Sequence, residues 1–293
     1  MRALLALIAV TAVWGVTFVQ VKDAVALYPL FAFLAVRFAI ATATLAVPGA
    51  KRVAQLGSSG IAAGALLGIL LAAGYAFQTA GLERTTVSGT GFVTGMYVVL
   101  TPLIALVLLR SRIGLAAWAG VVIATIGLAL LSGVHAGSAR GDLLVLASAA
   151  VYSLQIVLLE RFAPRYDPIG FTLVEMATAC AGLLAVALAL GDLGLPRGWT
   201  VWGALVVTGV FASALGYLAQ TWAQRRTSAT RVALAFTLEP VWAAFFGYTL
   251  DGDRLGALGW GGCALIMAGI VLAEPAAGAA LREALRRRRT PLR

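Results

Sequence analysis

The sequence predicts an all-α integral membrane protein, in which ten transmembrane helices form two inverted five-helix repeats around a central cavity and both termini are cytoplasmic. Three observations support this fold class: the composition, a succession of ten apolar segments, and an internal repeat. Of the 293 residues, 61% are hydrophobic and only 12% are charged, whereas soluble domains carry roughly 25% charged residues. A chain of this size with so little charge cannot cover a water-facing surface, so the composition indicates a lipid environment.

The composition also argues against several other classes of protein. The net charge is +10, but the basic residues separate apolar segments instead of forming one stripe, so no nucleic acid is expected as a partner. Cys180 and Cys263 lie in apolar segments and His135 is the only histidine, so neither a metal site nor a disulfide is expected. The motifs HExxH, GxSxG and GxxxxGK[ST] are missing from the sequence. We therefore expect no enzyme, no cofactor and no direct use of ATP.

Ten apolar segments are long enough to be considered as membrane spans. A bilayer core of about 30 Å requires about 20 apolar helical residues. The first segment is longer than the apolar core of a typical cleavable signal peptide, so we predict that it is a span. In order, the segments cover residues 4–21, 30–47, 60–82, 86–109, 115–133, 142–159, 169–190, 201–222, 231–250 and 255–273.

The basic residues predict how these spans are oriented, because translocation of Lys and Arg across the membrane is disfavoured. With the N-terminus in the cytoplasm, sixteen of the 22 basic residues fall on the cytoplasmic side, five fall outside, and Arg37 lies within a span. Only two basic residues are lysine, which is typical of a GC-rich bacterial genome. We predict a multi-pass protein of a bacterial inner membrane, in contact with membrane lipid, with residues 274–293 as a basic cytoplasmic tail.

An internal repeat relates the two halves of the chain. Aligning Gly74–Thr79 with Gly216–Thr221 requires no gap, and the same register also matches Trp118/Trp260, Gly120/Gly262 and Gly127/Gly269. The predicted units are residues 1–135 and 136–273. Because each unit has five spans, an odd number, the second enters the membrane from the opposite side. This inverted repeat is typical of secondary transporters, whose substrate site lies near the midplane between the halves.

Short motifs in the same order also resemble a known family. They are Trp14-Gly15-x-x-Phe18, Arg37-Phe38, Leu238-Glu239-Pro240-Val241, and Trp260-x-Gly262 followed by Gly269. This pattern resembles EamA-type members of the drug/metabolite transporter superfamily, and within it the bacterial aromatic amino-acid exporters. The resemblance implies a secondary transporter that exports small metabolites, above all amino acids, by alternating access. A multidrug or nucleotide-sugar-like transporter is the alternative, and a channel is disfavoured because the spans carry no continuous polar stripe.

Polar and aromatic side chains inside the spans are the candidates for a substrate-binding cavity, because lipid exposure of polar groups is costly. Tyr75, Gln78 and Thr79 share one helical face, and the repeat alignment reproduces this face in the other half. An alignment of the two halves with a slightly smaller offset pairs Trp14 with Tyr152. The alternative is that these groups join neighbouring helices. The full set of candidates is Trp14, Thr17, Tyr75, Gln78, Thr79, Tyr97, Tyr152, Gln155, Tyr217, Gln220 and Trp242.

Three charged residues and two prolines are candidates for gating or coupling. Arg37, Glu175 and Glu239 lie within predicted spans, where a charge needs a partner or a function. One interpretation is that Arg37 or Glu239 polarises the cavity or couples its two gates, and the alternative is that the two form a structural ion pair. Pro102 and Pro240 are expected to interrupt the fourth and ninth spans. The sequence makes no prediction of the oligomeric state.

Overall fold

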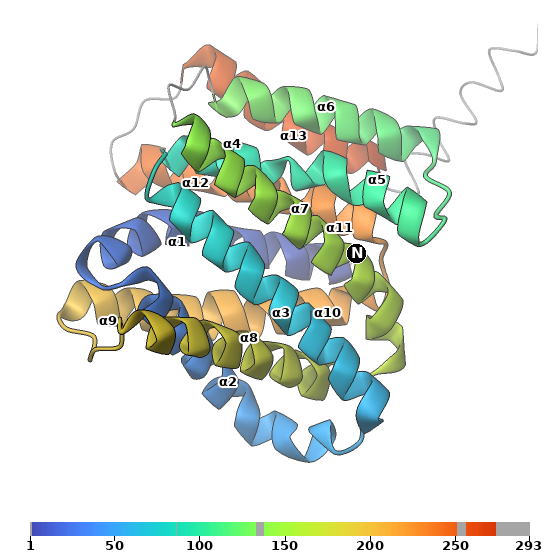
Figure 1. The fold of residues 1–293 in the computed structure, drawn as a ribbon. Helices are drawn as coiled ribbons and strands as arrows, with labels where there is room; N and C mark the ends of the chain where they lie inside the picture. The colour runs from blue at the N-terminus through green and yellow to red at the C-terminus, as the bar shows by residue number, and fades with distance from the viewer. Residues whose placement is uncertain (1, 86, 133–137, 251–255, 274–293) are drawn as a thin grey trace, which may run out of the picture.

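The computed structural model describes residues 2–85, 87–132, 138–250 and 256–273, and these residues form a bundle of helices without strands (Figure 1). The predicted tail, residues 274–293, lies outside the described residues. The helices are α1 (Arg2–Leu27), α2 (Leu30–Val53), α3 (Gly57–Leu82), α4 (Val87–Gly95), α5 (Tyr97–Leu108), α6 (Leu115–Ser132), α7 (Ala139–Phe162), the 3₁₀ turn η1 (Ala163–Arg165), α8 (Pro168–Leu190), α9 (Trp199–Val206), the π-helical stretch η2 (Val207–Leu215), α10 (Gly216–Gln224), α11 (Ala229–Phe236), α12 (Leu238–Leu250) and α13 (Ala257–Ala273).

Each predicted apolar segment coincides with a helix or with consecutive helices. Within the described ranges, seven helical stretches are long and apolar enough to cross a membrane, and α6 and α13 contain shorter apolar helices. The ninth segment consists of the two short helices α11 and α12. The chain is therefore a multi-pass helical membrane protein, while the count of ten crossings stays a prediction.

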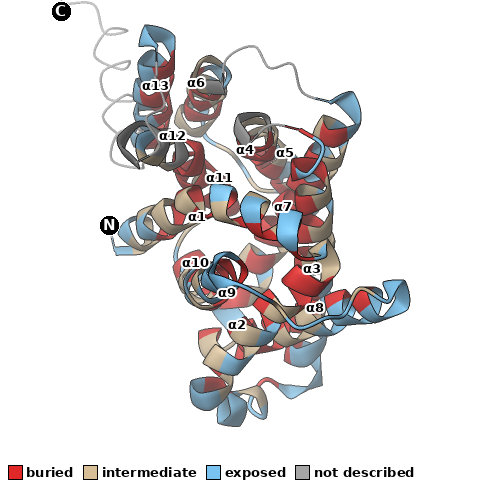
Figure 2. Cartoon of the chain, turned by 90° about the vertical axis from the view of Figure 1, so that its left-hand side faces the viewer, coloured by how far each residue is buried: buried red, intermediate tan, exposed pale blue. Residues whose placement is uncertain are grey.

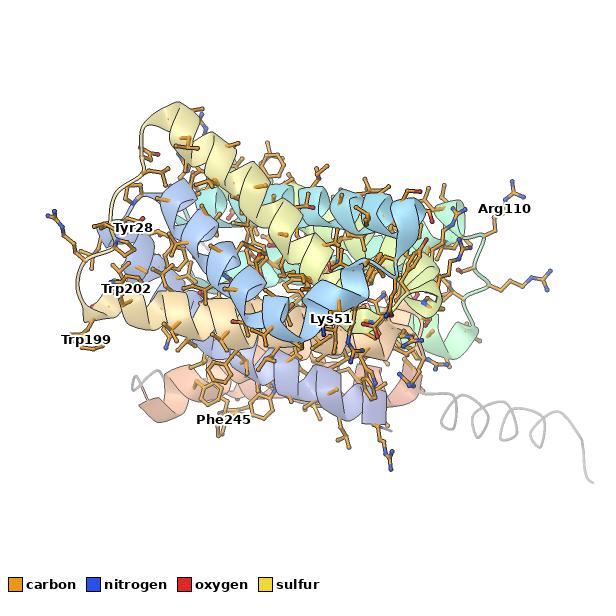
Figure 3. The ribbon with its side chains drawn as sticks, turned by 90° about the horizontal axis from the view of Figure 1, so that it is seen from below. Tyr28, Lys51, Arg110, Trp199, Trp202 and Phe245 are labelled. Atoms are coloured by element: carbon orange, nitrogen blue, oxygen red, sulfur yellow. The ribbon has the colours of Figure 1, made fainter. Side chains whose placement is uncertain are left out.

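The outer surface of the bundle suits lipid. Figure 2 shows that buried residues face the middle of the bundle, whereas much of the outside is exposed. Large apolar side chains are prominent there, such as Val107 and Leu115, each 75% exposed. Trp199 and Arg110 project at opposite ends of the molecule (Figure 3). An apolar flank with a tryptophan at one end and an arginine at the other fits a protein embedded across a bilayer.

Two spans are broken into shorter helices. The fourth predicted span breaks at Met96, between α4 and α5, and the ninth breaks at Thr237, between α11 and α12. Pro240 lies in the first turn of α12, where its missing N–H cannot continue the preceding helix. Pro102, however, lies inside α5, downstream of the break. The helix continues on both sides of the Pro102 ring, and whether Pro102 kinks it stays a prediction.

Close helix contacts recur at the spacings of the predicted repeat. A Cβ atom on Gly74 in α3 would lie 2.5 Å from Cε1 of Tyr152 in α7, and one on Gly216 in α10 would lie 3.1 Å from Nε1 of Trp14 in α1. Gly74 and Gly216 are aligned in the predicted repeat, and Trp14 and Tyr152 are the pair aligned by the smaller offset. In both halves, then, a glycine leaves room for an aromatic ring of the other half, which supports the predicted duplication.

The helices α6 and α13 pack side by side at one edge of the bundle (Figure 1). A Cβ atom on Gly120 would lie 2.6 Å from the carbonyl oxygen of Gly269, and one on Gly262 would lie 2.5 Å from that of Gly127. These four glycines are matched pairs in the repeat alignment. Their contact is reciprocal, as expected when two equivalent helices meet across a two-fold axis.

The π-helical stretch η2 is a difference between the halves. A Cβ atom on Gly68 in α3 would contact the Glu175 carbonyl oxygen, and one on Gly209 in η2 would contact the Arg37 carbonyl oxygen. The stretch from Gly209 to Gly216 in the second half is one residue longer than the equivalent stretch from Gly68 to Gly74 in the first half. A π-helical turn accommodates one additional residue, so η2 accounts for the difference. The same contacts make Arg37 and Glu175 equivalent positions.

Candidate functional site

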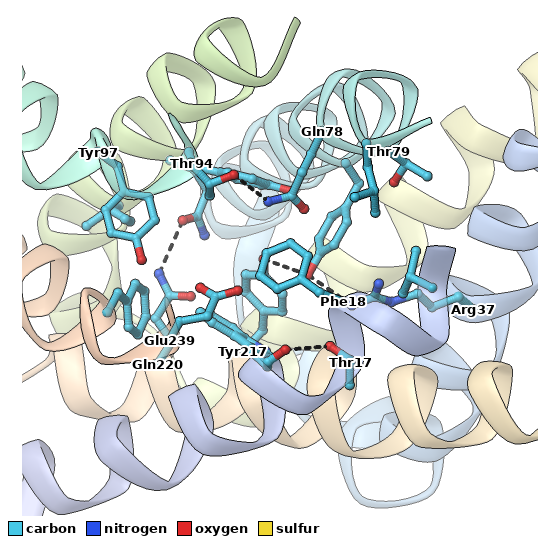
Figure 4. Close-up of a pocket in the computed structure, with 18 residues that line it drawn as sticks. Thr17, Phe18, Arg37, Gln78, Thr79, Thr94, Tyr97, Tyr217, Gln220 and Glu239 are labelled. Atoms are coloured by element: carbon cyan, nitrogen blue, oxygen red, sulfur yellow. Dashed lines mark hydrogen bonds between the residues drawn. The ribbon is translucent and has the colours of Figure 1, made fainter. Parts of the chain in front are cut away.

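A central cavity lies between the two halves (Figure 4), and its empty volume, including space open to solvent, is about 680 Å³. Its walls come from α1, α2, α3, α4, α5, α7, α10, α11 and α12. The lining residues are Trp14, Thr17, Phe18, Val21, Arg37, Tyr75, Gln78, Thr79, Leu82, Thr94, Tyr97, Tyr152, Gln155, Ile156, Tyr217, Gln220, Phe236 and Glu239.

Aromatic rings contributed by several helices form one wall of the cavity. The ring of Tyr75 packs edge-on against Tyr152, with centroids 5.6 Å apart, and against Tyr217, with centroids 6.3 Å apart. Trp14 contacts Tyr217 and Phe236 at centroid distances of 5.5 and 4.8 Å. Edge-on and tilted contacts of this kind hold aromatic rings in defined orientations. The wall therefore offers a firm apolar surface to a flat or apolar ligand group.

The duplicated tyrosine and glutamine positions meet at the cavity. The hydroxyl of Tyr217 donates a hydrogen bond to that of Tyr75, its repeat partner, over 3.2 Å. The amide of Gln78 donates to Thr94 Oγ1 over 3.1 Å, and Gln78 Oε1 accepts from the Tyr152 hydroxyl over 3.3 Å. These groups both line the cavity and join helices, so the two sequence-based interpretations describe the same residues.

Arg37 places a buried cation at the cavity wall. Its Nε donates to Ser213 Oγ over 2.9 Å and its Nη2 donates to the Tyr75 hydroxyl over 3.0 Å. The guanidinium carbon lies 4.4 Å from the centroid of the Tyr75 ring, within the range of a cation–π contact. A guanidinium has five N–H donors, so this arrangement holds the charge in place and leaves donors available to a ligand.

Glu239 places an acidic group in the same cavity. Figure 4 shows Arg37 and Glu239 on different sides, with aromatic rings between them, and the Tyr97 hydroxyl pointing toward Glu239. Ion pairs in the described part of the chain join Arg52 with Asp167 and Arg84 with Glu83. The alternative of a structural ion pair between Arg37 and Glu239 is therefore wrong, because both side chains face the cavity from separate walls.

Behind the cavity, a chain of amide groups leads to Glu175. Gln155 donates from Nε2 to Glu175 Oε1 over 2.8 Å, and its Oε1 accepts from Gln220 Nε2 over 3.2 Å. Gln220 Nε2 also donates to Gln224 Oε1 over 2.9 Å, and Gln224 Nε2 donates to the carbonyl oxygen of Ile156 over 2.7 Å. Gln155 and Gln220 line the cavity, whereas Glu175 does not.

Most of the candidates from the sequence converge on the cavity. Trp242 does not line it, because its side chain packs against Phe245 and Phe246. Glu175, Pro102 and Pro240 are also absent from the walls, and whether any lining residue binds substrate stays a prediction. The candidates that do line the cavity are Trp14, Thr17, Arg37, Tyr75, Gln78, Thr79, Tyr97, Tyr152, Gln155, Tyr217, Gln220 and Glu239.

Six lining residues were not predicted. Thr94 is a polar residue inside the fourth span, and that signal was available in the sequence. The other five are apolar, and nothing distinguishes them from lipid-facing or core residues before the helices are packed. The six are Phe18, Val21, Leu82, Thr94, Ile156 and Phe236. In the described residues, no three side chains of His, Cys, Asp or Glu are grouped so that they could hold a metal ion.

A helical membrane bundle with equivalent helix contacts in its two halves and a cavity between them has the architecture of a membrane transporter. The family comparison agrees with this class. Residues 1–133 and 139–273 each match the EamA-like transporter family. The chain therefore belongs to the EamA-like transporter family, and as such it takes a small-molecule substrate in a lipid environment.

Individual relatives span nearly the whole chain. An uncharacterized transporter of Archaeoglobus fulgidus is 30% identical over 274 residues, which cover 92% of this chain and 84% of the relative. The uncharacterized transporter YyaM of Bacillus subtilis is 25% identical, and the match covers 89% of each chain. One solved crystal structure, 21% identical, superposes with a TM-score of 0.78 over 94% of this chain and 99% of the other. This structure supports the fold alone.

Proposed function

We propose that this protein is a secondary transporter that moves amino acids with aromatic or other apolar side chains across the bacterial inner membrane. The observation that carries the proposal is the cavity itself, in which Arg37 and Glu239 face the same space without pairing with each other and aromatic rings lie between them. Opposite charges held apart suit a zwitterion. The outward direction of transport rests on the resemblance to exporters.

Each part of such a substrate has a matching group in the cavity. Arg37 has N–H donors left for a carboxylate, which guanidinium groups bind through strong charge-assisted hydrogen bonds. Glu239, beside the Tyr97 hydroxyl, suits an ammonium group. The aromatic wall of Trp14, Tyr75 and Tyr217 suits an apolar side chain. This division of roles requires all three substrate features at once, so it predicts selectivity against molecules that lack one of them.

The equivalent glycine–aromatic contacts of the two halves favour a rocking mechanism of transport. We propose that residues 1–135 and 136–273 are inverted repeats that rock against each other and expose the cavity alternately to either side. The glycine contacts support this, since Gly74 of the first unit packs against Tyr152 of the second, and Gly216 of the second unit packs against Trp14 of the first. The broken helices at Met96 and Thr237 provide equivalent hinge points beside the cavity.

A counterflow assay tests the substrate class. Purified protein in liposomes loaded with unlabelled phenylalanine should take up radiolabelled phenylalanine transiently and saturably, and empty liposomes should not. Phenethylamine lacks the carboxylate and 3-phenylpropionate lacks the ammonium group, so both should compete poorly. Absence of counterflow with every amino acid would refute the proposal. Strong competition by aromatic cations or nucleotide sugars would favour the other branches, and uptake that never saturates would indicate a channel.

A further inference from the structure

Glu175 is a buried acid that the proposed substrate site does not use. Its side chain is fully buried in α8. Oε1 accepts one hydrogen bond from Gln155, and Oε2 has no hydrogen-bond partner among the described residues. An ionised carboxylate in an apolar interior is costly without a cation, and acidic groups inside membrane spans tend to mark proton or ion pathways.

No cation in the described part of the chain compensates Glu175. Helix α8 packs against α2, α3, α10 and η2. The buried ionisable side chains on these elements, and on α7, which carries Gln155, are Arg37, Tyr75, Tyr152 and Tyr217. The guanidinium of Arg37 bonds to Ser213 and Tyr75, and Tyr217 also bonds to Tyr75. On α8 itself, Cys180 donates to the carbonyl oxygen of Ala35. Lys51 and Arg52, the other basic residues of α2, are exposed near its C-terminal end.

The hydrogen bonds of the amide chain have a direction that depends on Glu175. As an ionised acceptor, Glu175 draws the Nε2 of Gln155 toward itself, so Gln155 turns its Oε1 to Gln220. Gln220 Oε1 is then left without a donor among the described residues. If Glu175 instead carries a proton, its O–H can donate to Gln155 Oε1. Gln155 can then turn its Nε2 toward Gln220. The Gln220 amide turns over in response, so that its Oε1, which lacks a donor, accepts this bond and its Nε2 leaves Gln155 and Gln224.

We propose that Glu175 is a proton-binding site and that Gln155 links its protonation to the central cavity. The proton comes from water that enters the cavity and is held on Oε1, where it donates to Gln155. Because Gln155 and Gln220 line the cavity, the two protonation states present different hydrogen-bonding atoms to a ligand. A ligand that prefers one arrangement changes the proton occupancy, and the proton changes the ligand affinity by the same factor. This link to substrate rests on the proposed function.

Infrared difference spectroscopy of the purified protein tests the proton site without any ligand. Spectra recorded from acidic to alkaline buffer should contain a protonated-carboxyl band that titrates, is present in the wild type and is missing from Glu175→Gln. Glu83→Gln is the matched control, since Glu83 is an exposed carboxylate at the end of α3. No Glu175-dependent band, or one that does not change with pH in folded protein, overturns the proposal.

Two further measurements of the Glu175 titration midpoint test the link through Gln155. Gln155→Leu should keep the Glu175 band and move its titration midpoint by about one pH unit or more, because a hydrogen bond to a charged group contributes about 1.5–3 kcal/mol. An unmoved midpoint would show that Gln155 does not sense the proton. In the wild type, saturating phenylalanine should also move the midpoint, by about one pH unit for each tenfold difference in affinity between the two states.

The outcomes separate this proposal from the proposed function. If phenylalanine shows saturable counterflow and leaves the Glu175 midpoint unchanged, the link is wrong while the transporter function holds. If no amino acid gives counterflow but the Glu175 band titrates and shifts in Gln155→Leu, the proton site holds and the substrate class is wrong. Gel filtration and thermal unfolding of each variant establish that it is folded.

Discussion

Equivalent positions in the two halves of this protein carry opposite charges. Arg37 lies on α2 and Glu175 on α8, and their carbonyl oxygens contact equivalent glycines, Gly209 and Gly68. Arg37 reaches the cavity, bonds to Ser213 and Tyr75, and lines the wall. Glu175 stays behind the wall and contacts the cavity only through Gln155. The helix contacts are equivalent, while the side-chain chemistry differs between the halves.

One backbone difference between the halves lies at η2, next to Arg37. In the first half the third helix, α3, is continuous, but its equivalent in the second half contains the π-helical stretch η2. Ser213 of η2 accepts a hydrogen bond from Arg37, and the carbonyl oxygen of Ala212 accepts one from Trp14. π-helical turns are frequent at functional sites. The comparison teaches that two halves with equivalent helix contacts can differ locally at η2, where Ser213 holds Arg37 at the cavity wall.

The largest expected effect comes from removing the charge of Arg37. Arg37→Met should lower the apparent affinity for phenylalanine about 100-fold, because a hydrogen bond to a charged group contributes about 1.5–3 kcal/mol and about 1.4 kcal/mol is a factor of ten. Phenethylamine, which has no carboxylate, should be affected much less. Competition in the counterflow assay measures both ligands.

The same substitution at an exposed arginine, Arg197→Met, controls for loss of charge alone. Its affinity for phenylalanine should match the wild type. An equal loss for phenylalanine and phenethylamine in Arg37→Met would mean that Arg37 supports the cavity without binding a carboxylate.

The next effect compares the two glycines beneath the aromatic rings. Gly74→Ala should destabilise the protein by about 2 kcal/mol, because the new methyl group would overlap the Tyr152 ring, and overpacking costs about 1–3 kcal/mol. Gly216→Ala should cost less than about 1 kcal/mol, since its nearest contact, Trp14 Nε1, lies 3.1 Å away. Thermal unfolding in detergent compares them. The reverse order would show that the second half is packed more tightly than its contacts indicate.

A smaller difference is expected between the paired glutamines. Gln220→Leu removes the donor to both Gln155 Oε1 and Gln224 Oε1, and buried acceptors without donors cost about 1–3 kcal/mol. Gln78→Leu releases Thr94 and Tyr152, which face the cavity and can bond to other groups there, so it should cost less. Urea or thermal unfolding of both variants measures the difference, and equal losses would contradict the distinction between wall and interior.

The smallest effects concern the aromatic pair Trp14 and Tyr152. Trp14→Phe removes the 2.9 Å hydrogen bond to the Ala212 carbonyl oxygen and should cost about 1 kcal/mol. Tyr152→Phe removes a longer bond, 3.3 Å to Gln78, and should cost about 0.5 kcal/mol. Unfolding midpoints in detergent provide the comparison. A larger loss in Tyr152→Phe would show that its hydroxyl, more than the indole N–H of Trp14, holds the two halves together.

Much of the candidate site was predictable because polar groups inside apolar spans are conspicuous. Gln78, Gln155 and Gln220 were identified in this way, and all three line the cavity. Trp242 does not line the cavity, since an aromatic ring can also pack against apolar neighbours such as Phe245 and Phe246 outside it. The equivalence of Arg37 and Glu175 was present in the sequence, at the same spacing that relates Trp14 to Tyr152, but charges of opposite sign concealed it.

The sequence by itself determined the lipid environment and the helical class, and it predicts the duplication, because each depends on composition or on spacing along the chain. A shortage of charge excludes water at the surface, and apolar segments of sufficient length must satisfy their backbone hydrogen bonds as helices. Tertiary structure alone decided which side chains share one cavity. The packing of helices distant in sequence decides whether Arg37 meets Glu239 and whether Glu175 lies at the cavity surface or behind Gln155. Contacts such as that of Gly209 with the Arg37 backbone and that of Gly68 with the Glu175 backbone set this packing.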